Sequence, residues 1–419
     1  MTDEVTHVGV QILGFGPAAL GVFVAADRLG LLDSLLATGV LVLEREPTFD
    51  QMTRRLFPWQ VRTNSLGREF VDGLARAGRF GELLADPAIA SLALSTEIVH
   101  MSRVHRFMAG LAEATRRVLV ESGNSPRFGV SVRAVEQLPG GGFLTRDAAG
   151  RIIAMSDSVV LAVGAAEVPR TPPTGGPVIY SGHVLRQEFG EVASAVGSGR
   201  SIRIVGDSHS AFSVVDLLSR ELGDRMRVGQ GHILVRQVRR FFRDVAAASR
   251  AGEPVGDGDV CPESGKVNRF DGLRGDALAA YERIVSGQDR RFVLLHAGAD
   301  LSDLEQPAIT IQASGYRARF VRIAQPTGEP LVCRSADGGP ETDSRCRVLG
   351  VDGRRVSGLY ALGLGHSPRT GSGHRRASVN FFHGADGAAL VSSLVGRLGG
   401  QRTSACGPAV RINVVGGLS

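Results

Sequence analysis

The chain has 419 residues, of which 43% are apolar and 21% are charged, and 55 are glycines without a periodic repeat. These values exclude collagen-like and low-complexity sequences, and they predict a soluble globular protein large enough for two domains. The net charge is +6, and the basic residues are arginines except for one lysine, Lys266. Scattered arginines and few aromatic residues argue against a nucleic-acid surface, and Lys266 precedes Val267, which excludes a Gly-Lys-Ser/Thr phosphate loop.

The N-terminal residues carry no basic region of the signal-peptide kind, and we expect a cytoplasmic protein. The uncharged run Val8–Ala26 is long enough to span a bilayer. Its internal Gly14, Gly16 and Pro17 favour a strand, a turn and a buried helix instead. No two cysteines form a C-x-x-C pair, which argues against a redox pair and a zinc ribbon; they are Cys261, Cys333, Cys346 and Cys406.

A short β-branched run, His7–Leu13, predicts a buried strand, and helical spacing follows over Ala18–Leu36. Between them lies a G-x-G-x-x-A pattern in the context that a dinucleotide-binding turn requires. Gly14 permits the tight turn, Gly16 lets the backbone approach a pyrophosphate, and Ala19 allows close packing of helix and strand. The start of the helix then presents free N–H groups to the phosphates, with Pro17 and Ala18 in its first turn.

The next strand is predicted over Gly39–Leu43, and Glu44 ends it. A carboxylate at this place accepts hydrogen bonds from the hydroxyls of an adenosine ribose. Further along, a helix is predicted near Arg103–Arg117, followed by an antiparallel excursion over Phe128–Ala154 that turns at Gly140–Gly142.

A second turn of the same kind is formed by Gly206-Asp207-Ser208-His209-Ser210-Ala211, after a predicted strand at Ser201–Val205. A core-facing helix follows to Leu222, and the next strand, His232–Val235, ends in Arg236. Arg236 follows Gly206 by 30 residues, as Glu44 follows Gly14. A base at this strand end suits a 2′-phosphate, and Arg236 with Arg239 therefore indicates NADPH. Ser208 stands where the second glycine is expected, and a solvated strand end remains the alternative for the arginines.

Residues 243–273 form a long segment rich in Gly, Asp and Pro. Loops of this length are uncommon unless they are functional or disordered. We expect this one to cover a cleft between domains and to help select the substrate, with Lys266, Asn268 and Arg269 facing a substrate carboxylate; a surface loop without such a role is the alternative.

With these motifs in order, the sequence resembles the two-dinucleotide-binding flavoproteins, and among them the NADPH-dependent N-hydroxylating monooxygenases that act on ornithine and lysine. The resemblance runs over about residues 7–396 and rests on four segments: Gly206–Ala211, Ser158–Gly164 with the prolines after it, the A-S-G-Y segment Ala313–Tyr316, and Gly358–Gly363. The sequence departs from the group's pattern at Ser208, at His209 in place of Gln, and at Leu364 in place of an acid.

The resemblance implies an α/β fold of two Rossmann-like domains, with an FAD domain at 1–172 and 346–398, an NADPH domain at 173–345 and a loosely held tail at 399–419. It implies an oxidoreductase in which NADPH reduces FAD, O2 forms a C4a-hydroperoxide, and a small amine or amino acid is hydroxylated on nitrogen. No protein residue is assigned as catalytic, no metal is expected, and a homo-oligomer is left open. For FAD the implied contacts are Gly14, Gly16, Pro17, Ala18, Ala19, Glu44, Arg45, Trp59, Asn64, Ser65, Gly164 and Gly363. For NADPH they are Gly206, Ser208, His209, Ser210, Arg236 and Arg239.

Two neighbouring classes fit less well. Baeyer–Villiger and related S- or N-oxygenating enzymes carry F-x-G-x-x-x-H past the first crossover, whereas Thr174–Tyr180 has the Gly without the Phe or the His. Oxygenation of carbon or sulfur is therefore the second hypothesis, and a nucleotide-binding flavoprotein without turnover is the third. The absence of a cysteine pair argues against the disulfide reductases.

Overall fold

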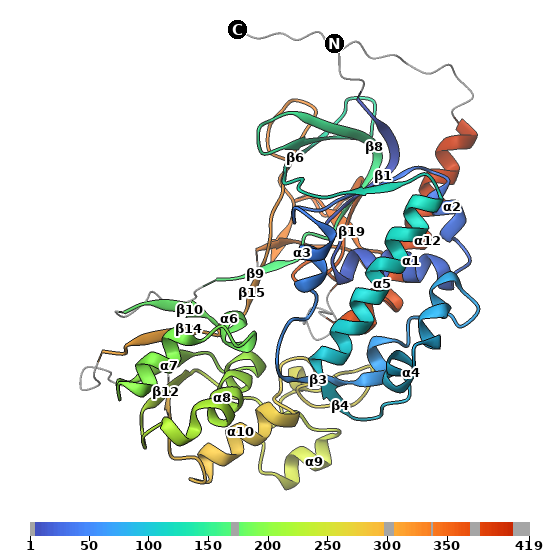
Figure 1. Cartoon of the computed structure of the whole chain (residues 1–419). Helices are drawn as coiled ribbons and strands as arrows, with labels where there is room; N and C mark the ends of the chain where they lie inside the picture. Colours follow the sequence, from blue (N-terminus) through green and yellow to red (C-terminus); the bar gives the residue numbers. More distant parts are fainter. Residues whose placement is uncertain (1–4, 169–175, 297–305, 337, 369–377, 405–419) are drawn as a thin grey trace.

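The computed structural model describes residues 5–168, 176–296, 306–336, 338–368 and 378–404. Two α/β lobes lie side by side, joined by an antiparallel ribbon of β9 (Ala165–Glu167) and β15 (Tyr316–Ala318) (Figure 1). The chain crosses from the larger lobe to the smaller one through β9 and returns through β15. Each lobe is built on its own sheet, as expected for a chain with two dinucleotide-binding turns.

The larger lobe holds, in the described residues, a nine-stranded sheet in the order β16-β6-β7-β8-β1-β2-β5, with β20 also on β8 and β19 on β20. The pairs β1–β2, β1–β8 and β20–β8 are parallel, whereas β6, β7 and β8 are antiparallel, as the glycine turn predicts. The strands are β1 (His7–Leu13), β2 (Val40–Leu43), β5 (Ser125–Arg127), β6 (Val132–Gln137), β7 (Phe143–Asp147), β8 (Ile152–Leu161), β16 (Arg322–Ala324), β19 (Arg347–Leu349) and β20 (Arg355–Ala361).

Helices cover one face of this sheet, because Val10 and Ile12 of β1 share a core with α1, α5 and α12, whereas Leu41 and Leu43 of β2 belong to the core on the other face. The helices of this lobe are α1 (Pro17–Arg28), α2 (Leu32–Leu36), α3 (Phe49–Arg54), α4 (Pro87–Ala93), α5 (Met101–Glu121), α11 (Val379–Phe382) and α12 (Ala385–Ser404), with short 3₁₀ turns η1 (Gly67–Phe70) and η2 (Arg79–Ala85). A small ribbon, β3 (Arg62–Leu66) with β4 (Ile98–His100), lies beside η1.

The smaller lobe has a five-stranded sheet, within the described residues, in the order β10-β14-β11-β12-β13, and every pair is parallel. Its strands are β10 (Val178–Tyr180), β11 (Ile202–Val205), β12 (Gly231–Val235), β13 (Phe292–His296) and β14 (Ile309–Gln312). Its helices are α6 (Ser181–Leu185), α7 (Gly190–Gly197), α8 (His209–Leu222), α9 (Val245–Arg250) and α10 (Gly275–Val285), with 3₁₀ turns η3 (Gly223–Arg225) and η4 (Asp257–Asp259). The remaining ribbon is β17 (Ser335–Ala336) with β18 (Gly339–Pro340).

Three expectations differ from the structure. The helix predicted over Ala18–Leu36 is two helices, because Gly30 has a φ of +67° that ends α1 and re-aims the chain into α2. Residues 399–404, predicted as the start of a tail, belong to α12, which continues to Ser404; residues 405–419, like Pro169 and Pro172, lie outside the described residues. The chain also rejoins the larger sheet at β16, earlier than the predicted boundary at 346.

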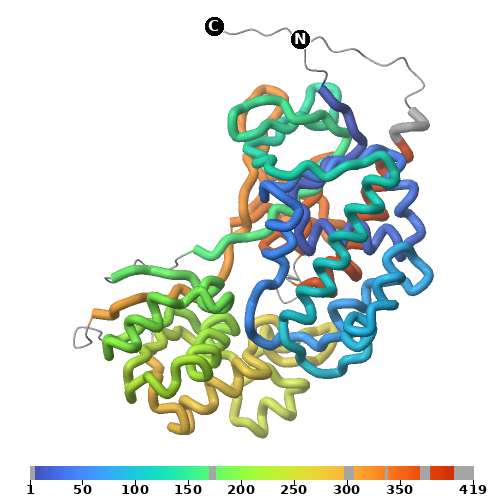
Figure 2. Tube along the Cα trace, viewed as in Figure 1, coloured from blue at the N-terminus to red at the C-terminus, as the bar shows by residue number. Residues whose placement is uncertain are grey.

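The segment 243–273 is folded rather than an open loop. It contains α9 and η4, and single β-bridges join Phe242 and Val260 to Val267. It lies against the larger lobe, because the ring of Phe270 is 6.4 Å from that of Phe381 in α11. In Figure 2 the yellow segment accordingly runs beside the blue chain of β3 and β4. The segment, which we call the bridging segment, therefore contacts both lobes.

Candidate functional site

The first glycine turn leaves an open cradle at the start of α1. Gly14 has a φ of +102°, and a Cβ there would lie 2.5 Å from the carbonyl oxygen of Ala162, so that no larger residue fits. Gly16 is different, since a Cβ there would meet nothing within 4 Å. No side chain caps the N-terminus of α1, which begins at Pro17. The turn therefore presents free N–H groups to an empty space of the kind that a phosphate fills.

Glu44 is held rigidly at the end of β2, beside that cradle. The residue is buried and only 7% exposed. Phe15 N–H donates to Oε2 at 2.8 Å, and Glu46 N–H donates to Oε1 at 2.9 Å. A carboxylate anchored by two backbone donors has its remaining lone pairs aimed in fixed directions, as a ribose acceptor requires.

A buried histidine that the motifs did not reveal fixes the start of α1. His383, after α11, is 1% exposed, and its Nε2 lies 3.2 Å from the carbonyl oxygen of Pro17. Burial lowers the pKa of His383 to about 4. The ring is therefore neutral near pH 7, and its Nε2–H donates to Pro17 across 366 residues of sequence. Such a contact between distant segments leaves no local pattern in the sequence.

The second turn repeats the first at the start of α8. A Cβ on Gly206 would lie 2.4 Å from the carbonyl oxygen of Ala313, and Ser208 occupies the N-cap position without capping the helix through its side chain. His209 Nε2 accepts a hydrogen bond from Arg274 N–H at 3.3 Å. Burial, with a smaller effect from the Arg274 charge, lowers the pKa of His209 to about 4. The imidazole of His209, the first residue of α8, is therefore neutral near pH 7.

The three arginines at the end of β12 differ in their surroundings. The Nε of Arg236 lies 3.3 Å from Asp207 Oδ2, and its side chain is 70% exposed. Arg239 pairs with Asp259 at 2.7 Å, and Arg240 pairs with Glu253 at 2.7 Å. Arg239 and Arg240 therefore hold the bridging segment in place, whereas the side chain of Arg236 is exposed at the end of β12.

A cavity of about 720 Å³ connects the two turns and lies between the lobes. It brings together many of the expected cofactor residues: Gly14, Gly16, Pro17, Ala18, Glu44, Arg45, Trp59, Asn64, Ser65, Gly164, His209, Ser210 and Gly363. The others do not line it: Ala19, Gly206, Ser208, Arg236 and Arg239. One continuous space thus passes both glycine turns, as two cofactors that exchange a hydride require.

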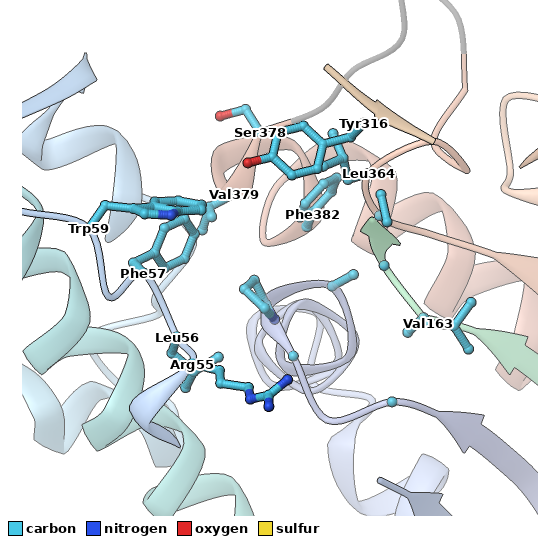
Figure 3. Close-up of a pocket in the computed structure, with 18 of the residues that line it drawn as sticks. Arg55, Leu56, Phe57, Trp59, Val163, Tyr316, Leu364, Ser378, Val379 and Phe382 are labelled. Carbon is cyan, nitrogen blue, oxygen red and sulfur yellow. The ribbon is translucent and has the colours of Figure 1, made fainter. Parts of the chain in front are cut away.

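The centre of the cavity is aromatic and apolar. Trp59 and Phe57 pack edge to face, with ring centroids 5.7 Å apart, and Tyr316 of β15 and Phe382 of α11 face the same space (Figure 3). Burial raises the pKa of Tyr316, so that its hydroxyl stays protonated. Leu364 also lines this part. Large apolar groups around a few polar atoms exclude water, as a site for a reactive intermediate requires.

The three residues expected to meet a substrate carboxylate do not line the cavity. Asn268 donates from Nδ2 to the carbonyl oxygen of Arg240 at 2.9 Å, and Arg269 Nη1 donates to Cys261 Sγ at 3.3 Å. Lys266 is half-buried, away from the cavity wall. Arg274, one residue past the predicted segment, lines the cavity instead. Sequence reasoning missed Arg274 because nothing in its local pattern distinguishes it from the other arginines.

Two negative findings apply to the described part of the chain. It contains no group of three or more His, Cys, Asp or Glu side chains arranged to hold a metal ion. None of its helices is both long enough and apolar enough to cross a bilayer.

The fold, with two Rossmann-like lobes and a glycine turn in each, is similar to that of two-domain flavoproteins of known structure. The chain superimposes on the ornithine N-hydroxylase of Kutzneria sp. 744 with a TM-score of 0.60 and 16% identity, covering 93% of this chain and 99% of that one. With the L-lysine 6-monooxygenase of Pseudomonas syringae the TM-score is 0.59 at 17% identity, covering 94% and 100%. The fold and the resemblance seen in the motifs are therefore confirmed.

Comparison of sequences gives one particular relative. The chain is 28% identical, over 411 residues, to the CMP-5′-(3-aminopropyl)phosphonate hydroxylase of Streptomyces rubellomurinus, covering 88% of this chain and 91% of the relative. No family model matches the chain.

Proposed function

We propose that this chain is an FAD-dependent, NADPH-using monooxygenase that hydroxylates the nitrogen of a small amine or amino acid. The observation that carries the proposal is the single cavity that passes both glycine turns. The relative in Streptomyces is a hydroxylase whose named substrate contains a primary amine, and the structural neighbours act on ornithine and lysine. FAD, once reduced, activates O2 for transfer to a nucleophile.

The first turn fits the FAD. Gly16 and the start of α1 face the pyrophosphate, Glu44 accepts from the ribose hydroxyls, and the neutral His383 keeps the carbonyl of Pro17 in place. The second turn fits NADPH in the same way, with the start of α8 toward its pyrophosphate. The cavity between the two turns would then hold the reacting ends of the two cofactors.

The side chains of the cavity also suit an amine nucleophile, which has to lose its proton before it attacks oxygen. The apolar centre of the cavity disfavours a protonated amine, because burial in apolar surroundings destabilises the charged form. His209 adds no charge, because its pKa is about 4. The aromatic wall of Trp59, Phe57 and Tyr316 excludes the water that would divert the oxygen to hydrogen peroxide.

Arg236→Ala tests the dinucleotide assignment. We expect kcat/KM for NADPH to fall about 10- to 100-fold, because one or two charge-assisted hydrogen bonds to the 2′-phosphate are lost. We expect kcat/KM for NADH to stay unchanged, because NADH lacks that phosphate. The measurement is the steady-state rate of NAD(P)H oxidation by the flavin-loaded enzyme. Arg243→Ala, which removes an exposed arginine paired only with the adjacent Asp244, is the matched control. An unchanged preference for NADPH in Arg236→Ala would show that the 2′-phosphate binds elsewhere.

The activity itself is tested on the purified protein reconstituted with FAD. NADPH is expected to bleach the flavin, and the rate of NADPH oxidation in air is expected to rise when a primary amine is added. A protein that holds no flavin after reconstitution, or whose flavin is not reduced by NADPH, contradicts the proposal.

A further inference from the structure

Arg274 is a pre-oriented cation in the cavity wall. It is the last residue before α10, and its guanidinium carbon lies 4.2 Å from the centre of the Phe241 ring. Its Nη2 donates to the carbonyl oxygen of Arg269, which fixes the plane of the group. Stacking on an aromatic ring and one backbone contact leave the rest of the guanidinium fork available to a ligand.

The charge of Arg274 is not matched by a partner in the described residues. Of the four other arginines that line the cavity, three have one: Arg45 and Arg55 pair with Glu46, and Arg62 pairs with Asp276; the fourth is Arg319. Arg274 makes no such ion pair, and its Nε is buried without a hydrogen-bond acceptor.

Burial lowers the pKa of Arg274, and only more distant carboxylates, Glu69 first, offset this effect. A desolvated cation without a counter-ion is costly, and binding an anion removes much of that cost.

The guanidinium of Arg274 lies close enough to the start of α8 for its charge to contribute to the lowered pKa of His209. The backbone N–H of Arg274 contacts His209 at the start of α8, and the guanidinium reaches the Arg269 carbonyl and the field of Glu69 in η1. The neighbouring cation Arg269 lies over the ring of Phe381 in α11. Arg274 therefore lies where the bridging segment meets the start of α8 and the larger lobe, so that its effects on amine affinity and on NADPH affinity have to be measured separately.

We propose that Arg274 binds an oxyanion of the substrate, a carboxylate, phosphonate or phosphate group at the end of the molecule opposite the amine. The inference rests on the proposed function, because the amine end is assigned from it. A guanidinium carries N–H donors in a planar fork, which suits the oxygens of such a group. Arg274 then selects amines that carry an anionic end and positions their nitrogen in the aromatic centre.

The test uses Trp59, which is the one tryptophan of the chain and lines the cavity, as a reporter of binding without turnover. The flavin-loaded enzyme is titrated with 3-aminopropylphosphonate, 4-aminobutanoate and the neutral 4-aminobutan-1-ol, and the fluorescence is followed. The two anionic amines are expected to bind at least about tenfold more tightly than the neutral one. CMP-5′-(3-aminopropyl)phosphonate is added as a fourth probe. The order of the Kd values then shows whether the site prefers a carboxylate, a phosphonate or a phosphodiester.

Arg274→Gln is expected to raise the Kd of the anionic amines about 10- to 100-fold and to leave that of 4-aminobutan-1-ol unchanged. Arg274→Lys, which keeps the charge without the fork, is expected to restore part of the affinity. Arg243→Gln removes an exposed arginine of the same segment and is the matched control. Circular dichroism verifies that each variant is folded.

Three results would overturn the assignment: no preference of the wild-type enzyme for anionic amines, wild-type affinity in both Arg274 variants, or a loss of NADPH affinity in place of amine affinity. Failure of the proposed function is recognised separately. If anionic amines bind through Arg274 but no hydroxylated product forms, the assignment of the oxyanion site is confirmed and the proposed monooxygenase reaction is contradicted.

Discussion

Gly16→Ala is expected to produce a folded protein that retains no FAD. The residue has ordinary backbone angles, with a φ of −85°, and an added Cβ would meet no atom within 4 Å, so the polypeptide accepts alanine. The methyl group would occupy the space through which the pyrophosphate approaches the backbone. We expect the affinity for FAD to fall at least about 100-fold, which corresponds to ~2.7 kcal/mol. The measurement is the flavin absorbance per mole of protein, with circular dichroism to verify the fold.

Two glycines give matched controls for this variant. Gly110→Ala, in the middle of α5, places its Cβ at an ordinary 3.5 Å from Leu83, and we expect full flavin content. Gly14→Ala places its Cβ 2.5 Å from a backbone oxygen, and we expect a destabilised protein. A Gly16→Ala protein with the flavin content of the wild type would show that the cofactor does not lie across this turn.

The second large effect is a loss of stability in acid that depends on His383. The folded protein holds this histidine neutral with a pKa of about 4, whereas the unfolded value is 6.5. The unfolded chain therefore binds the proton more tightly, and stability that is complete above pH 6.5 is lost as the pH falls toward 4. At ~1.4 kcal/mol per pH unit, this one residue lowers the free energy of unfolding by about 3 kcal/mol over that range.

Urea unfolding of the wild type and of His383→Gln between pH 7.5 and 4 measures this contribution. The variant is expected to be less stable than the wild type near pH 7 and to lose stability less steeply on acidification. His7→Gln, at a side chain that is 56% exposed, is the control and is expected to keep the wild-type slope. Equal slopes for the wild type and His383→Gln would mean that the buried ring is not neutral.

Both nucleotide-binding units could be predicted from the sequence because each is local. The strand His7–Leu13 is found with its predicted ends, and β2, β11 and β12 differ from their predictions by one residue at their N-terminal ends. The hydrophobic period, the glycines and the terminal residue lie within about forty positions of one another. The break at Gly30 was missed because hydrophobic spacing continues across it, and only the φ of that glycine ends the helix.

The substrate end of the site could not be predicted, because distant segments build it. Arg274 acquires its role from Phe241 and from the absence of an ion pair, and His383 acquires its role from Pro17. The expected substrate residues, Lys266, Asn268 and Arg269, were chosen from the composition of residues 243–273, and none of them lines the cavity. Neither the pairing of charges nor the direction of a side chain can be read from a single sequence.

The most direct test of the account is the position of the oxygen atom in the product. The flavin-loaded enzyme is supplied with NADPH, ¹⁸O₂ and 3-aminopropylphosphonate, 4-aminobutanoate, L-ornithine or L-lysine, and the products are analysed by mass spectrometry with fragmentation. The account predicts a hydroxylamine that carries one ¹⁸O on nitrogen. A product with the label on carbon would contradict this expectation. It would also be contradicted if the enzyme oxidised NADPH in the presence of every amine but formed hydrogen peroxide as the sole oxygen product.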